Sequence, residues 1–196
     1  MRVEDGFYRR HLPHWQVDGA PHFITWRLEG ALPAHMTAEF IRIDEQLDAA
    51  ETGPLRLRQP QIAQLIVNAL HYGERQLKLY ELLAWVVMAN HVHVVLYPRA
   101  KLAQITKAVK GYTALEANRM LERTGQFWQH ESFDRWIRDR YELERIIRYV
   151  ERNPVKAGLV KCEDDFRWSS AFPVPQASGL RKGQAGGLPY ADAVAR

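Results

Sequence analysis

The sequence is poor in cysteine and has no long apolar run. Its 196 residues include one cysteine, Cys162, which excludes an internal disulfide framework and a zinc site built on several thiolates. No segment approaches the roughly 20 consecutive apolar residues that cross a bilayer, and the first residues, MRVEDGFYRRH, lack the apolar core of a secretory signal. We therefore expect no membrane partner and a cytoplasmic location. Any metal must be held by histidine, asparagine or carboxylate ligands.

Positive charge is concentrated in one part of the chain. The net charge is +4, and residues 101–161 contain 13 Lys and Arg against 8 Asp and Glu, whereas the remainder contains 14 against 15. An excess confined to one segment is typical of a surface that contacts nucleic acid. The alternative is a solvated, arginine-rich face without a partner.

The chain length fits one domain with appendages. Residues 1–20 contain Pro13 and clustered aromatic residues without a helical or strand period, which indicates an ordered arm. Residues 21–171 form the domain. Residues 172–196 are rich in proline and glycine and poor in apolar side chains, so we expect a flexible tail. We expect a monomer, with a dimer as the alternative.

Periodicity predicts the order β, α, β, β, α, β, α within the domain. The first α of this order stands for two helical stretches separated by the proline-containing segment TGPLRLRQP. The last helix should end at Asn153-Pro154, because the α region is disfavoured for a residue that precedes proline. This order predicts an α+β fold with a ferredoxin-like, split β-α-β antiparallel sheet and helices on one or both faces. The predicted strands are 22–28, 77–88, 91–97 and 133–138, and the predicted helices are 36–48, 61–71, 102–123 and 141–152.

The segment NHVHVVLYP, residues 90–98, carries the clearest chemical signal. On a strand, successive side chains alternate between faces, so His91 and His93 project from one side while aliphatic residues occupy the other. Two imidazoles side by side can chelate a divalent cation. The alternative is a chance His-x-His pair in a chain with 8 histidines.

The segment RIIRYVERNPVKAGLV, residues 145–160, is the second signal. At about 100° per residue it forms an amphipathic helix with an apolar arc and an opposite arginine arc. Tyr149 falls at the border between them, and Asn153 lies about one turn and about 6 Å further along. Alternatively, Tyr149 is a half-buried amphipathic side chain with its hydroxyl in water, and Asn153 is a helix terminator.

Five phrases in this sequence resemble the REP-associated tyrosine transposases, relatives of small insertion-sequence transposases that have one catalytic tyrosine and a His-hydrophobic-His motif. They occur in family order over about 150 residues and are followed by Trp168-Ser169-Ser170. The phrases are YRRHLPHW (8–15), FITWRLEGALP (23–33), WVVMANHVHVVLYP (85–98), FWQHESFDRWIRD (127–139) and RYVERNPVKAGLV (148–160).

The resemblance implies roles for four residues. His91 and His93 match the metal-binding histidines, Tyr149 matches the nucleophile, and Asn153 matches the polar third ligand. The implied cofactor is a divalent metal, Mg²⁺ or Mn²⁺, and Mn²⁺ suits histidine ligands better. Tyr149 would attack DNA to give a 5′-phosphotyrosine and a free 3′-hydroxyl.

The implied substrate is single-stranded DNA folded into an imperfect hairpin from a repetitive extragenic palindrome. Basic side chains in the positive segment are candidates to hold its phosphates, and two aromatic side chains, Trp136 and Phe127, are candidates to stack on bases. Two alternatives remain, a hairpin-binding module that no longer cuts and a metal-independent hairpin RNA binder. The candidate basic residues are Arg135, Arg138, Arg148, Arg152 and Lys156.

Overall fold

A four-stranded antiparallel sheet forms the centre of the protein. We analysed a computed structural model, which describes residues 6–9, 13–31 and 53–173. The sheet has the order β4-β5-β3-β6. Its strands are β3 (His22–Arg27), β4 (Tyr80–Val87), β5 (His91–Pro98) and β6 (Phe133–Trp136), and the helices are α2 (Pro60–Arg75), α3 (Leu102–Met120) and α4 (Arg140–Lys156), with short 3-10 turns η1 (Arg56–Arg58) and η2 (Glu163–Asp165).

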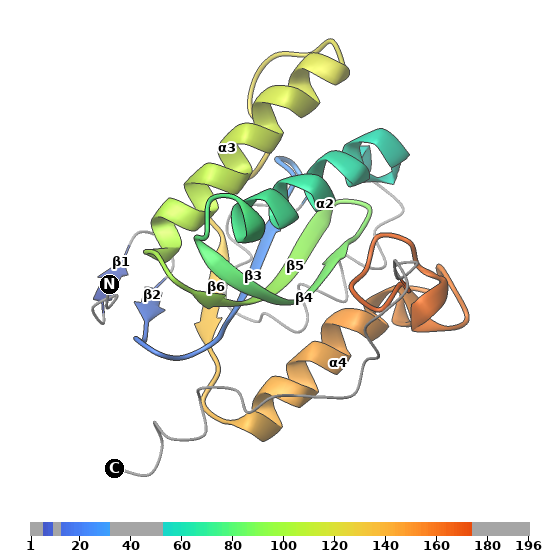
Figure 1. Ribbon diagram of the computed structural model, residues 1–196. Coiled ribbons are helices and arrows are strands. Elements are labelled where there is room, and N and C mark those ends of the chain that lie inside the picture. The colour runs from blue at the N-terminus through green and yellow to red at the C-terminus, as the bar shows by residue number, and fades with distance from the viewer. Residues whose placement is uncertain (1–5, 10–12, 32–52, 174–196) are drawn as a thin grey trace, which may run out of the picture.

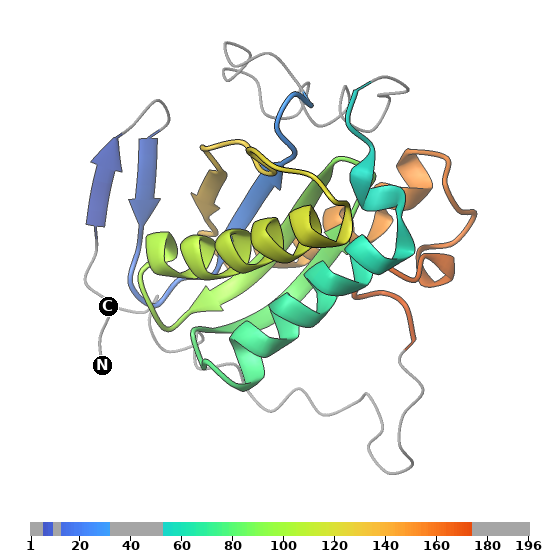
Figure 2. The same ribbon diagram turned by 90° about the horizontal axis from the view of Figure 1, so that it is seen from above.

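The succession β3-α2-β4-β5-α3-β6 is the split β-α-β arrangement, so the predicted α+β fold is confirmed. Helices α2 and α3 cover one face of the sheet, and α4 lies on the other face (Figure 1). Seen from above, α2 and α3 lie side by side across the strands (Figure 2). Helix α4 thus forms a separate layer that packs mainly against β4 and β5.

The pleat of β5 divides its side chains between two cores. Val92, Val94 and Leu96 belong to the larger core beneath α2 and α3. Val95 belongs to the smaller core beneath α4, together with Phe23 of β3. Because side chains alternate along a strand, His91 and His93 share the α4 side with Val95, as the sequence predicts.

The segment after α4 covers the edge of the sheet at β4. Val86 and Ser169 form an antiparallel bridge, and the Val87 amide donates to the Trp168 carbonyl at 2.8 Å. The Ser170 hydroxyl donates to Glu151 of α4 at 3.0 Å and accepts from the Trp85 amide at 3.1 Å. An uncovered edge strand would leave backbone groups unpaired, so this segment both protects β4 and ties it to α4.

The N-terminal arm contains strands that its sequence does not predict. β1 (Gly6–Arg9) and β2 (Pro13–Gln16) pair as an antiparallel hairpin, and β2 packs beside β6 (Figure 2). Four residues per strand are too few for a visible period. The Gln16 side chain accepts from the Leu102 amide at 2.9 Å, so the arm supplies a partner for the uncapped start of α3.

Several predicted element ends differ from the structure by a few residues. Helix α2 ends at Arg75 instead of residue 71, and α4 continues through Pro154 to Lys156 instead of ending at Arg152. Proline removes one donor, but here it falls in the last turn, and the Ala157 amide still reaches the Asn153 carbonyl at 3.0 Å. The predicted helix 36–48 and most of the predicted tail, residues 174–196, lie outside the described residues. Within the described ranges, no helix is long and apolar enough to cross a membrane.

Candidate active site between the sheet and helix α4

Two buried imidazoles meet on the α4 side of β5. His91 and His93 have no exposed surface, and their Nε2 atoms lie 3.0 Å apart. Their ring centroids are 4.6 Å apart at an interplanar angle of 70°. Two residues apart on one strand, the rings project from the same face. The strand geometry therefore places the Nε2 atoms of the two rings next to each other.

The other nitrogen of each ring has its own partner. His91 Nδ1 lies 2.7 Å from Asn90 Oδ1. An amide oxygen only accepts, so His91 carries its proton on Nδ1 and presents a lone pair at Nε2. His93 Nδ1 lies 2.7 Å from the Thr25 hydroxyl of β3, which can either donate or accept. Thr25 therefore permits both neutral forms of His93, one that donates from Nε2 to His91 and one that presents a second lone pair.

Burial keeps His93 neutral. Desolvation lowers its pKa from the ordinary value of 6.5 to about 3, and its ring stacks on Phe23 with centroids 5.5 Å apart. Neutral imidazole is the form that binds a metal ion. The ring is thus in the ligand form throughout the physiological pH range.

Tyr149 of α4 lies beside this pair. Its ring centroid is 5.9 Å from that of His93 and 6.2 Å from that of Phe23, and the residue is half-buried. The Lys156 Nζ atom lies 4.8 Å from the Tyr149 ring centroid, within range of a cation–π contact. Fold and packing thus bring together the tyrosine and the histidines that the sequence singles out separately.

Asn153 is a buried amide with nothing to bind. The residue has no exposed surface, and neither its Oδ1 nor its Nδ2 has a hydrogen-bond partner among the described residues. Leaving a buried polar group unpaired costs about 1–3 kcal/mol. Such an orphaned amide, one turn after Tyr149, is chemically suited to be a ligand for a cation together with the two imidazoles. The described residues contain no group of three or more His, Cys, Asp or Glu that could hold a metal, so a site here depends on this amide.

The predicted DNA-contacting residues fall into two groups. Arg148, Arg152 and Lys156 are exposed on α4. Arg135 on β6 and Arg138 after it are exposed but bound to Glu142 of α4.

The predicted aromatic stacking residues differ in exposure. Trp136 is half-buried at the end of β6. The prediction that Phe127 stacks on bases is wrong, because this side chain is 1% exposed and packs edge-on against Trp128 in the core.

Sequence reasoning missed three further residues near the site. Thr25 and Asn90 orient the histidines, and Glu142 orients the arginines. The contact of Asn90 could have been expected from the sequence, since Asn90 directly precedes His91. Glu142 could also have been noticed, because Asp139 and Glu142 have the spacing of a capping box at a helix start. In the structure Asp139 is the N-cap of α4 and accepts from the Glu142 amide at 2.8 Å. Thr25 had no such signal, because its contact depends on the pairing of β3 with β5.

Comparison with known proteins agrees with this geometry. Residues 61–153 match the sequence model of the family described as IS200-like transposase. The matched segment contains both histidines, Tyr149 and Asn153. No curated protein matches the chain significantly.

Two solved structures are similar to the chain. One is the structure of a REP-associated tyrosine transposase bound to a REP hairpin, with a TM-score of 0.55 and 20% identity over 92% of this chain and 96% of the other. The second is a candidate transposase from Deinococcus radiodurans R1, with a TM-score of 0.42 and 17% identity over 68% of this chain and 89% of the other. The resemblance predicted from the sequence is thus confirmed, in family model and in fold.

Proposed function

Because residues 61–153 match the sequence model of IS200-like transposases, we propose that the protein is a metal-dependent, single-strand-specific DNA endonuclease and strand transferase with Tyr149 as nucleophile. The observation that carries this proposal is the meeting of Tyr149 with the His91–His93 pair on one face of the sheet. A tyrosine of purely structural use needs no such neighbours.

Tyr149 does the covalent chemistry. Its phenolic oxygen forms a bond with the scissile phosphorus while the bond from phosphorus to the 3′-oxygen breaks. The phenol proton passes to solvent, and the departing 3′-oxygen takes up a proton. The product is a 5′-phosphotyrosine and a free 3′-hydroxyl. The phosphodiester is exchanged for another ester, so a 3′-hydroxyl can reverse the step without a nucleotide triphosphate.

His91, His93 and Asn153 would hold a divalent metal ion, Mg²⁺ or Mn²⁺. When bound, the ion acts as a Lewis acid for the phosphoryl oxygens and orients the phosphate. Two neighbouring side chains orient these ligands. Asn90 fixes the tautomer of His91, and the Thr25 hydroxyl can accept a hydrogen bond from the Nδ1–H group of His93, which leaves the Nε2 lone pair of His93 for the metal.

The substrate we propose is a single-stranded DNA hairpin of the REP type, since the fold is shared with a transposase that was solved bound to a REP hairpin. Arg148, Arg152 and Lys156 lie on the same helix as Tyr149 and would hold phosphates on either side of the cleaved bond. Trp136 would offer a face for base stacking.

Covalent trapping tests the proposal. Wild-type protein is incubated with Mn²⁺ and a pool of hairpin oligonucleotides that carry randomised single-stranded feet, and adducts are separated on a denaturing gel. We expect an adduct that needs the metal and disappears in Tyr149→Phe, with binding unchanged because phenylalanine keeps the ring. Peptide mass spectrometry then locates the nucleotide.

Two other tyrosines provide matched controls. Tyr141 is 85% exposed on the same helix, and Tyr112 is 54% exposed on α3, so Tyr141→Phe and Tyr112→Phe should both form the adduct at the wild-type level. A nucleotide on any peptide other than the one with Tyr149 contradicts the assignment. Hairpin binding without any adduct would favour the alternative, a binding module that does not cut.

A further inference from the structure

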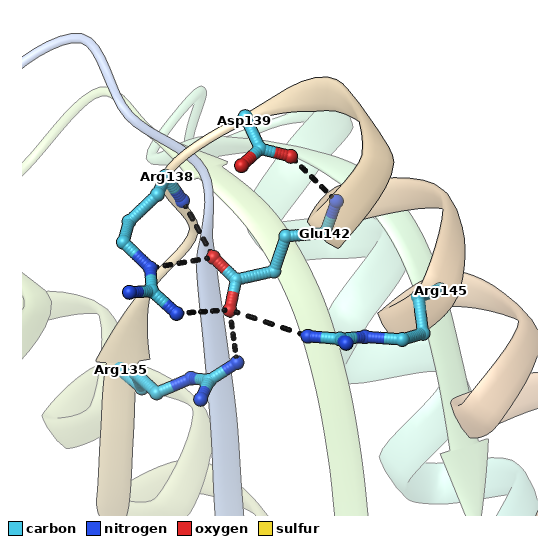
Figure 3. Close-up of polar contacts among 5 residues, drawn as sticks. All are labelled: Arg135, Arg138, Asp139, Glu142 and Arg145. Carbon is cyan, nitrogen blue, oxygen red and sulfur yellow. Dashed lines mark hydrogen bonds and ion pairs between the residues drawn. The ribbon is translucent and has the colours of Figure 1, made fainter.

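A buried carboxylate holds three arginines at the start of α4. The Glu142 side chain is 4% exposed, and its Oε1 accepts from Arg135 Nη2 at 2.6 Å while its Oε2 accepts from Arg138 Nε at 3.2 Å. Arg145 Nη2 lies 3.7 Å from Oε1. Figure 3 shows the three guanidinium groups converging on this one carboxylate from β6, from the segment after it and from α4.

The cluster carries a net positive charge and faces solvent. Three guanidinium groups surround one carboxylate, and the side chains of Arg135, Arg138 and Arg145 are 44%, 65% and 74% exposed. Each guanidinium has five donors in a fixed plane, whereas a carboxylate offers only about four lone-pair sites, so one carboxylate cannot accept from all the donors of three arginines. Without Glu142 the three positive groups would repel one another and move apart.

The carboxylate itself stays ionised at neutral pH. Burial alone would raise the Glu142 pKa, but the hydrogen bonds from Arg138 and the nearby charge of Arg135 lower it overall. The negative charge is thus fixed beneath the arginines rather than exposed beside them.

The cluster lies on the nucleophile's side of the helix. Glu142 precedes Tyr149 by seven residues, which is about two turns, about 10 Å along the axis and about 20° around it. A DNA strand whose phosphate lies at Tyr149 therefore passes the arginines if it runs along α4.

We propose that Glu142 is a positioning residue that preorganises Arg135, Arg138 and Arg145 into a seat for one backbone phosphate of the DNA strand, about two helical turns along α4 from the cleaved bond. This inference rests on the proposed function for its reference point at Tyr149. Preorganisation matters because fixing a long side chain on binding costs about 0.5–1.5 kcal/mol, and the carboxylate has already fixed three of them.

The test uses a substitution for which simple electrostatics and loss of the preorganised seat predict opposite changes in DNA affinity. Glu142→Gln removes a negative charge from a DNA-binding surface, so simple electrostatics predicts tighter binding and a steeper salt dependence. Loss of the preorganised seat predicts the reverse, a Kd raised about tenfold and a plot of log K against log salt whose slope falls by about 1. Glu144→Gln is the matched control, because Glu144 is 52% exposed on the same helix and pairs with Arg140. It should leave binding unchanged or slightly tighter.

Binding is measured in EDTA on a Tyr149→Phe background, with a fluorescent hairpin oligonucleotide, so that the result does not depend on cleavage. Thermal unfolding checks that each variant is folded. If Glu142→Gln does not fold, Arg135→Gln replaces it and should lower the slope by about 1, with Arg140→Gln, 80% exposed, as its control. Equal or tighter binding by Glu142→Gln, or an undiminished slope in Arg135→Gln, overturns the inference.

A methylphosphonate scan along the single-stranded foot locates the phosphate. Neutralising the seated phosphate should abolish the difference in affinity that Glu142→Gln causes, whereas neutralising any other phosphate should preserve that difference. A wild-type protein that binds but forms no adduct refutes the proposed cleavage and leaves the seat standing. Conversely, if the wild-type protein forms the adduct but Glu142→Gln does not weaken its affinity for the hairpin, the proposed cleavage stands and the phosphate seat is refuted.

Discussion

Replacing Asn153 by leucine should stabilise the metal-free protein while it removes a metal ligand. Both polar atoms of the Asn153 side chain are buried without a hydrogen-bond partner among the described residues. An unpaired buried polar group costs about 1–3 kcal/mol, and an apolar group of similar shape avoids that cost. For a chain of this size we expect Asn153→Leu to gain about 2 kcal/mol in EDTA, which raises Tm by roughly 4–8 °C.

Mn²⁺ should reverse this ranking. A metal ion that binds only the folded state at a concentration about 100 times its Kd stabilises the protein by about 2.7 kcal/mol. Wild-type protein should gain this stabilisation, and Asn153→Leu should lose most of it. Differential scanning calorimetry in EDTA and across a Mn²⁺ titration measures both effects without DNA or cleavage.

Asn153→Asp gives the reciprocal result. A buried carboxylate without a partner is costly, so this variant should unfold earlier than wild type in EDTA and gain more than wild type from Mn²⁺. The reasoning is refuted if Asn153→Leu is destabilised in EDTA, or if Mn²⁺ raises its Tm as far as that of the wild type.

Three further predictions concern the surroundings of the site and the fold. Thr25→Val should weaken Mn²⁺ binding about 10- to 100-fold in a calorimetric titration, because valine cannot accept a hydrogen bond from the Nδ1–H group of His93 in the form that presents its Nε2 lone pair; unchanged affinity contradicts that role. Gly73→Ala should cost about 1–2 kcal/mol in urea unfolding, since the added Cβ overlaps the buried Tyr80 ring, whereas Gly111→Ala meets no described atom within 4 Å and should stabilise by about 0.5–1 kcal/mol. The pKa of Glu142 is lowered in the folded state, so its contribution is present above the unfolded pKa of about 4.3 and is lost as pH falls through the folded-state pKa; the Tm difference between wild type and Glu142→Gln should therefore shrink as pH falls below about 4.3, and a constant difference would contradict this assignment.

The sheet and its two faces are predictable from the sequence because strand periodicity is simple. In residues 91–97, alternation alone places the two histidines opposite the aliphatic row, and the structure confirms it. Which residues of a helix are buried is harder to predict, because the helical period of 3.6 residues does not fix the buried face as simply as strand alternation does. Leu102, Ile105, Val109 and Tyr112 of α3 have helical spacing in the sequence, and the first three are buried, but Tyr112 is 54% exposed. The buried stripe advances by four residues to Thr113 instead.

The surroundings of the site were less predictable, because they come from long-range pairing. Thr25 reaches His93 only because β3 and β5 pair in a register that sets these two residues opposite each other. Arg135 and Glu142 are only seven residues apart, but they meet because the chain turns from β6 directly into the start of α4. A register or a packing angle depends on the whole core, so no local pattern in the sequence contains it.

The continuation of α4 through Pro154 determines how the candidate groups are placed. If the helix ended at Arg152, Asn153 would lie in a loop, and its distance from Tyr149 would depend on that loop. In the helix, Asn153 is held about one turn from Tyr149 and about 40° around the axis. Proline at this position forgoes one hydrogen bond, yet it is buried, and the Leu159 amide still reaches its carbonyl at 2.9 Å. The proposed nucleophile and the proposed third ligand thus share one rigid element, and both histidines share another, the central strand β5. Groups carried on regular elements are positioned more precisely than groups on loops, so this site requires no loop closure to bring its four candidate residues together.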